Sequence, residues 1–99
     1  MPENNLRVVA RMVANPEAID EVRSILVGLV EPTRAEPGCV VYELLQNNSD
    51  PTDFTFVEEW ESDAALDAHL STEHIREAIS RLPALLAREP DIRRYSVVK

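Results

Sequence analysis

A change of hydrophobic period within residues 54–74 constrains the fold of this chain more than any other feature. In its first part, every second residue belongs to one set of aromatic and acidic side chains, as in a strand whose side chains point alternately to opposite faces. One alternating set is Phe54, Phe56, Glu58 and Trp60. After Ser62, a suitable helix N-cap, apolar residues and His69 recur at helical spacing. The segment therefore predicts a strand followed directly by a helix that carries His69 back over Trp60.

The remaining segments predict three more strands and one more helix. The strands are expected at residues 6–13, 39–46 and 91–99, and the helix runs from Asn15-Pro16 to about Ala35. Turn-forming residues 47–53 predict a hairpin with a long loop, and Ser71-Thr72 interrupts the second helical region. The order β-α-β-β-α-β predicts a single α+β domain over residues 1–99, a ferredoxin-like split arrangement with an antiparallel sheet and helices on one face.

The sheet face opposite the predicted helices is also apolar. Its residues are Val9, Val13, Val41, Leu45 and Val57. Helices cannot cover both faces of such a small sheet, and large exposed apolar patches are uncommon on soluble monomers. We therefore expect a homodimer in which two sheets pack face to face.

Charge and composition exclude several classes of partner. The formal net charge of −8 disfavours nucleic acid and anionic membrane surfaces. No apolar run is long enough to cross a membrane, and residues 1–5 lack the features of a signal peptide, so the expected location is cytoplasmic. Cys39 is the single cysteine, which rules out an internal disulfide, and we interpret it as a small hydrophobic residue.

Several side chains of the predicted fold converge on one pocket. They are Tyr42, Phe56, Glu58 and Trp60 from adjacent strands, with Leu66 and His69 from the helix above. An imidazole near neutrality can accept a proton from a phenol or enol, and Glu58 can orient it. The alternative is that His69 is a satisfied core residue and Trp60 only fills volume.

Metal and phosphate sites are not expected. His69 and His74 are five residues apart, which on one continuous helix separates them by about 140° and directs them to different sides. The two glycines form no phosphate-binding loop.

Three segments resemble the antibiotic biosynthesis monooxygenase (ABM) family, especially its quinol monooxygenase-like members: residues 33–42, 57–62 and 68–74. The resemblance implies a dimeric α/β barrel and oxygenation of a quinol or related phenolic small molecule by dioxygen, without a cofactor. It implies Trp60 as a pocket wall, His69 as the general base, Glu58 as its polar partner and His74 as a weaker candidate for substrate contact.

Two departures narrow the substrate class. Polyketide-oxidising relatives place an Asn four residues before the tryptophan, where this chain has Phe56, and haem-degrading relatives carry an Asn on the first strand, which residues 6–13 lack. Two other functions stay open: an isomerase or tautomerase of a small enolisable carbonyl compound, and a non-catalytic ligand-binding dimer.

Overall fold

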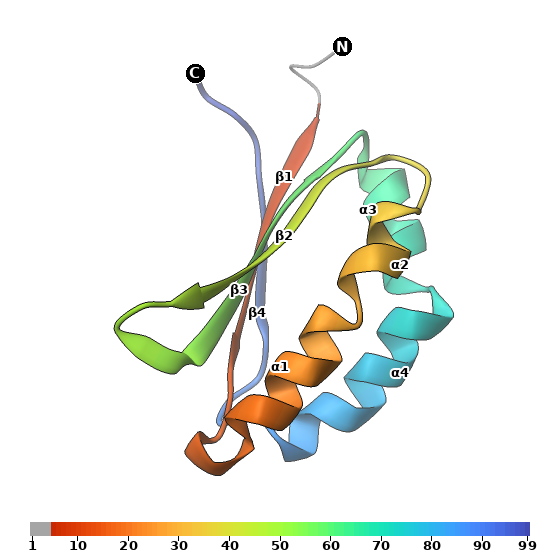
Figure 1. Cartoon of the computed structure of the whole chain (residues 1–99). Coiled ribbons are helices and arrows are strands. Elements are labelled where there is room, and N and C mark those ends of the chain that lie inside the picture. The colour runs from red at the N-terminus through yellow and green to blue at the C-terminus, as the bar shows by residue number, and fades with distance from the viewer. Residues whose placement is uncertain (1–4) are drawn as a thin grey trace.

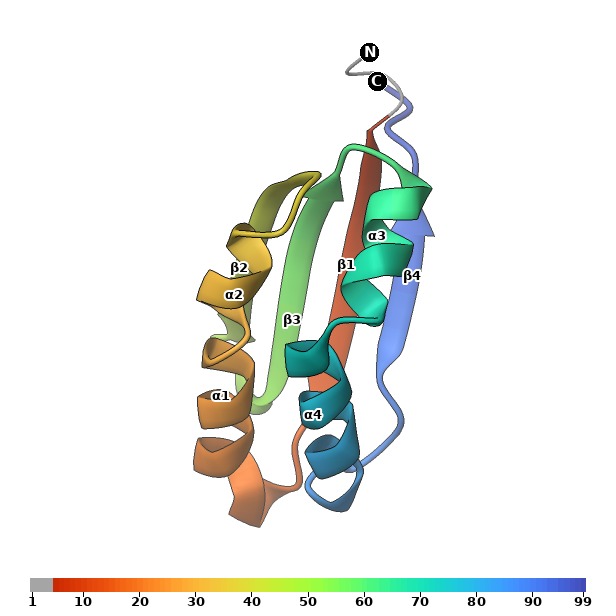
Figure 2. The same cartoon turned by 90° about the vertical axis from the view of Figure 1, so that its right-hand side faces the viewer.

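The computed structural model describes residues 5–99, so four of the five residues on which the signal-peptide prediction rests lie outside the described residues. It has the predicted split β-α-β-β-α-β arrangement, with a four-stranded antiparallel sheet in the order β2-β3-β1-β4. All helices lie on one face of this sheet (Figures 1 and 2). The predicted fold class is therefore confirmed.

The bounds of the elements follow the sequence patterns closely. The strands are β1 (Leu6–Val13), β2 (Cys39–Asn47), β3 (Asp50–Trp60) and β4 (Asp91–Tyr95). The helices are α1 (Ile19–Val27), α2 (Val30–Arg34), α3 (Asp63–Leu70) and α4 (Glu73–Arg81), with short 3-10 turns at Pro16–Ala18 and Leu82–Ala84. None of the helices in residues 5–99 has the length and apolar character to span a membrane.

The first helical region is divided, where the sequence predicts one helix to about residue 35. A turn at Gly28 and Leu29 separates α1 from α2. Pro32 explains the division, because it has no amide hydrogen to donate to the carbonyl of Gly28 four residues earlier. The predicted cap residue Asn15 makes no side-chain capping hydrogen bond.

The β2–β3 hairpin is tighter than predicted, and the expected long loop is wrong. Its turn contains only Asn48 and Ser49, because the polar side chains at the strand ends bond within the hairpin itself. The Asn47 side chain accepts from the amide of Ser49 at 2.8 Å and donates to Asp53 at 3.1 Å.

A bulge near the start of β2 also corrects the predicted strand faces. Cys39 pairs with Trp60 but Val41 pairs with Glu59, so Val40 is an extra residue in β2. Strict alternation along residues 39–46 predicts that Val40 shares a face with Tyr42, but the bulge leaves Val40 48% exposed.

The second helical region begins and breaks where the sequence predicts. The Ser62 hydroxyl caps α3 by accepting from the amide of Ala65 at 3.1 Å. The chain turns at Ser71 and Thr72 before α4. Two details differ from the sequence patterns. Helical spacing predicts that Ile79 shares a buried apolar stripe with Ile75, Ala78 and Leu82, but Ile79 is 55% exposed. The last strand ends at Tyr95 instead of continuing to Lys99.

The core lies between the inner face of the sheet and the helices. Its largest side chains are less than 2% exposed and include Trp60, Phe54, Phe56, Leu26 and Leu66. On the outer face Val9, Val41 and Leu45 are 36–48% exposed, as the sequence predicts. Val13 is an exception, because it is 8% exposed within the single chain.

Candidate active site

A cavity of about 580 Å³ lies between the sheet and helices α3 and α4. Five of the seven predicted site residues line it: Tyr42, Phe56, Glu58, Leu66 and His69. Most of the other lining residues are apolar and come from β1, α4 and the segment after α4. The predicted pocket therefore exists, with its polar groups confined to a few positions among apolar walls.

His69 is fixed by a carboxylate from a distant part of the chain. The residue is 3% exposed, and Nδ1 lies 3.1 Å and 3.0 Å from the two carboxylate oxygens of Glu36. Burial lowers the pKa of His69, while the hydrogen bond and charge of Glu36 act in the opposite direction. A neutral imidazole beside a carboxylate carries its proton on Nδ1, and Nε2 then presents a lone pair. Nε2 has no hydrogen-bond partner among residues 5–99.

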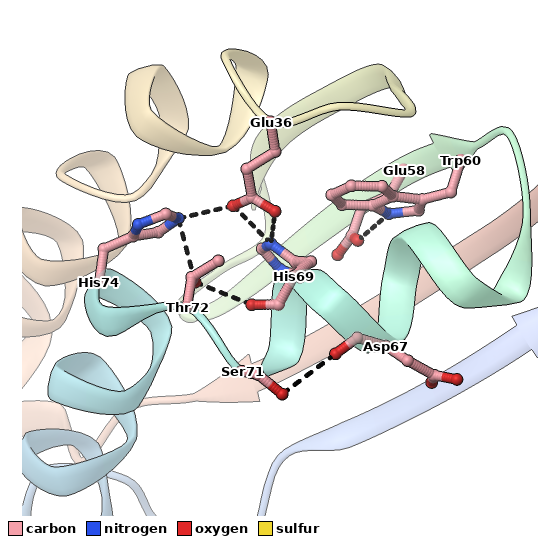
Figure 3. Close-up of polar contacts among 8 residues, drawn as sticks. All are labelled: Glu36, Glu58, Trp60, Asp67, His69, Ser71, Thr72 and His74. Atoms are coloured by element: carbon pink, nitrogen blue, oxygen red, sulfur yellow. Dashed lines mark hydrogen bonds and ion pairs between the residues drawn. The ribbon is translucent and has the colours of Figure 1, made fainter.

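Glu36 belongs to the candidate site, although the sequence did not predict it there. It lies in the turn between α2 and β2, and its side chain is 10% exposed. Its Oε2 also lies 2.6 Å from Nε2 of His74, so one carboxylate bonds both imidazoles (Figure 3). The only signal in the sequence is its presence in the family-like segment 33–42, since no local pattern pairs it with residues more than thirty positions away.

The two histidines converge, contrary to the prediction from a continuous helix. The turn at Ser71 and Thr72 separates α3 from α4 and redirects the chain, so His74 faces the same carboxylate as His69. Their ring centroids are 6.3 Å apart. His69 lines the cavity, whereas His74, predicted as a substrate contact, does not.

Glu58 lines the cavity and is held by the tryptophan two residues later. The indole Nε1–H of Trp60 donates to Oε1 of Glu58 at 2.8 Å, and the glutamate is 7% exposed. Burial raises the pKa of Glu58 to about 7; the Trp60 hydrogen bond lowers it and the charge of Glu36 raises it further. Near neutral pH this carboxyl group is thus divided between its protonated and ionised forms.

Two expectations for this pair are wrong. Trp60 is fully buried and absent from the cavity lining, so it lies behind the wall, with its ring 4.7 Å from that of His69. Glu58 bonds Trp60, whereas the group that orients His69 is Glu36.

Tyr42 is a further polar residue of the cavity lining, which also includes Arg88 and Glu89. Its ring stacks on Phe56 with centroids 4.7 Å apart and meets His69 edge-on at 5.6 Å. Burial, with the charge of Glu58, raises the pKa of the phenol, so Tyr42 remains protonated and can donate a hydrogen bond to a ligand.

Glu36, His69 and His74 also form the one group in residues 5–99 whose donor types and spacing suit a metal ion. Their ligating atoms all lie within 4.8 Å of one another. A continuous helix would direct the two histidines to different sides, but the break between α3 and α4 lets them share one site.

Comparisons with known proteins agree on one family. The family model described as antibiotic biosynthesis monooxygenase matches residues 5–81. A crystal structure described as an antibiotic biosynthesis monooxygenase superimposes with a TM-score of 0.90 at 38% identity, covering 95% of this chain and 99% of that chain.

Two further relatives have named organisms. The candidate monooxygenase Rv0793 of Mycobacterium tuberculosis is 33% identical over 82% of this chain and 79% of its own length. Its solved structure has a TM-score of 0.92 with 97% of each chain covered, at 27% identity in that alignment. The uncharacterised Synechocystis protein sll1783 is 30% identical over 93% of this chain, which spans 63% of that relative.

Proposed function

The chain belongs to the antibiotic biosynthesis monooxygenase family, and from this premise we propose that it is a cofactor-independent monooxygenase that oxidises a quinol or related phenolic small molecule with dioxygen. One observation carries the proposal. A buried histidine that lines the cavity has its Nδ1 held by a carboxylate, which leaves Nε2 available as a base.

The proposed chemistry begins with removal of a phenolic proton by Nε2 of His69. Glu36 stabilises the imidazolium that forms, as a carboxylate does behind a catalytic histidine. The phenolate gives one electron to dioxygen, and the two radicals join through a new carbon–oxygen bond. Loss of water then leaves a quinone. One hydroquinone and one dioxygen give one hydroxyquinone and one water, so the substrate supplies all the electrons.

The cavity residues support this chemistry in two ways. The apolar walls exclude water from the reactive anion, and the Tyr42 and Glu58 side chains offer polar contacts that orient the ring. Tyr42 and Phe56 provide a stacked aromatic surface beside His69, which suits a flat aromatic substrate.

Oxygen uptake tests the proposal directly. The protein is incubated with a panel of hydroquinones and anthrones without added cofactor, and we expect at least one rate above autoxidation. His69→Ala should remove most of that rate, on the order of 100-fold, while circular dichroism shows a folded chain. No rate above autoxidation for any compound would count against the proposed function, and a folded, fully active variant would remove His69 from the mechanism.

The raised pKa of Glu58 favours a second candidate, an isomerase or tautomerase of a small enolisable carbonyl compound. A protonated carboxyl group and a neutral imidazole that line the same cavity can donate and accept a proton on the same substrate. This reaction consumes no dioxygen, so turnover under anaerobic conditions distinguishes it from the oxygenase. Ligand binding without turnover in either condition would favour a binding protein.

A further inference from the structure

We propose that Glu36, His69 and His74 form a binding site for a divalent transition-metal ion of the Zn²⁺ type. The site would use a carboxylate oxygen of Glu36, Nδ1 of His69 and Nε2 of His74, which lie within 4.8 Å of one another. Two imidazoles and one glutamate are a ligand set that zinc uses in catalytic sites, where a fourth position stays open to water.

The distances fit an ion after a small movement. Glu36 Oε2 lies 3.0 Å from Nδ1 of His69 and 2.6 Å from Nε2 of His74. Ligand atoms bound tetrahedrally at about 2.0–2.1 Å from zinc lie roughly 3.3 Å from one another. The carboxylate must therefore retreat by less than about 1 Å, and the two imidazole nitrogens, which lie within 4.8 Å of each other, must adjust to the same spacing. Glu36 lies on a turn between two elements instead of within one.

Two of the three ligands are well buried, and the third is partly exposed to solvent. The side chains of His69, Glu36 and His74 are 4%, 10% and 27% exposed, so an ion reaches the cluster past His74. The Thr72 hydroxyl lies 3.3 Å from Nε2 of His74 and 2.8 Å from the carbonyl oxygen of His69. It offers a polar neighbour for a water molecule in the fourth position.

Metal binding has a consequence for His69. An ion on Nδ1 forces the remaining proton of the neutral imidazole onto Nε2, which then cannot accept a proton. The ion would therefore switch off the base of the proposed oxygenase. This consequence rests on the proposed function, whereas binding of the ion does not.

Calorimetric titration with ZnCl₂, on the full chain without an affinity tag and near neutral pH, tests the site without any turnover. We expect one equivalent to bind per chain. Loss of a residue that only supports a metal ligand weakens metal binding by about 10- to 100-fold. His74→Ala and Glu36→Gln each remove a ligand, so each should weaken Zn²⁺ binding by more than this. Two control variants should keep wild-type affinity: Glu73→Gln, an exposed carboxylate beside the cluster, and Cys39→Ser, which removes the single thiol.

Circular dichroism establishes that each variant is folded, and His74→Gln replaces His74→Ala if the alanine variant is not. Absence of Zn²⁺ binding in the wild type would overturn the proposal. So would binding that His74→Ala and Glu36→Gln leave unchanged, or binding that Cys39→Ser abolishes. These outcomes are independent of whether any substrate is oxidised, so failure of the site and failure of the proposed function remain distinct.

Discussion

His69 and Glu36 are separated by 33 residues in the chain, yet Nδ1 of the imidazole lies 3.1 Å and 3.0 Å from the two oxygens of the carboxylate. Their side chains are 4% and 10% exposed. Because both groups are buried, the carboxylate interacts more strongly with the imidazole than it would in water. Glu36 therefore fixes both the orientation and the tautomer of the residue we propose as the base.

Glu36→Gln should lower kcat for oxygen uptake by about 100-fold, because the amide no longer stabilises the imidazolium. KM should change little, since Glu36 does not line the cavity. Steady-state oxygen-electrode measurements give both constants. Glu31→Gln, an 84% exposed glutamate in α2, is the control and should behave like the wild type. A raised KM with unchanged kcat would show that Glu36 acts on binding instead.

The fold was predictable because its determinants are local. Alternation in β1 and β3 and the Ser62 cap of α3 are each encoded within a few residues, and the structure confirms them. The errors arise where local signals compete. Pro32 divides a helix whose apolar stripe is continuous, and the polar side chains around Asn48 tighten a hairpin that composition alone predicts as a long loop.

The site was predictable only in part, because some of its determinants are not local in the sequence. Strand and helix periods place Tyr42, Glu58 and His69 on faces that meet. The position of Glu36 depends on how the turn before β2 approaches α3, which is a tertiary contact with no periodic signal. Likewise, the convergence of His69 and His74 depends on the angle of the helix break, and sequence spacing does not give that angle.

Glu58 should make stability depend on pH. Its pKa in the folded state is about 7, above the ordinary value of 4.5, because the carboxyl group is buried. The folded state therefore binds this proton more tightly than the unfolded state. The resulting stability is fully present below about pH 4.5 and is lost as pH rises through 7, a loss of roughly 3 kcal/mol. Urea denaturation at a series of pH values measures it.

Glu58→Gln should not lose this stability. Its free energy of unfolding should therefore increase relative to that of the wild type as the pH rises. The contribution of His69 has the opposite sign, because burial lowers its pKa, but it is present in both proteins. Glu61→Gln alters an exposed carboxylate just beyond β3 and serves as the control. Parallel stability curves for Glu58→Gln and the wild type would contradict the prediction.

Gly38 should be intolerant of any side chain. It has φ of 85°, and a Cβ atom there would lie 2.6 Å from Cβ of Ala65 in α3. Gly38→Ala should therefore cost more than the about 1–2 kcal/mol of the left-handed conformation alone. Gly28→Ala is the matched control: its φ is −63° and the nearest atoms would lie at 3.4 Å. We expect it to be neutral or to stabilise by up to about 1 kcal/mol. Equal free energies of unfolding for the two variants would contradict this account.

The apolar outer face of the sheet leads us to expect a homodimer in solution. Val9, Val41, Leu45 and Tyr95 are 36–48% exposed on this face of the four-stranded sheet, where charged residues such as Arg7, Glu43 and Glu59 lie among them. Val9→Lys places a charge on the central strand β1 and should convert the dimer to a monomer, as measured by light scattering. Val27→Lys alters a valine on α1 that is 54% exposed, against 36% for Val9, and should leave the dimer intact. A wild-type monomer at micromolar concentration would contradict the expectation.

If the metal site and the oxygenase both exist, Zn²⁺ should inhibit oxygen uptake and a chelator should restore it. The His69 imidazole cannot bind the ion and accept the substrate proton at the same time. The Zn²⁺ concentration that inhibits should therefore agree with the Kd from calorimetry. Mg²⁺ should not inhibit, because it prefers oxygen ligands in octahedral geometry and this cluster offers two nitrogens. His74→Ala removes one ligand, so its remaining activity should require at least about 10-fold more Zn²⁺ for the same inhibition. Equal sensitivity of this variant and the wild type would show that inhibition arises elsewhere on the protein.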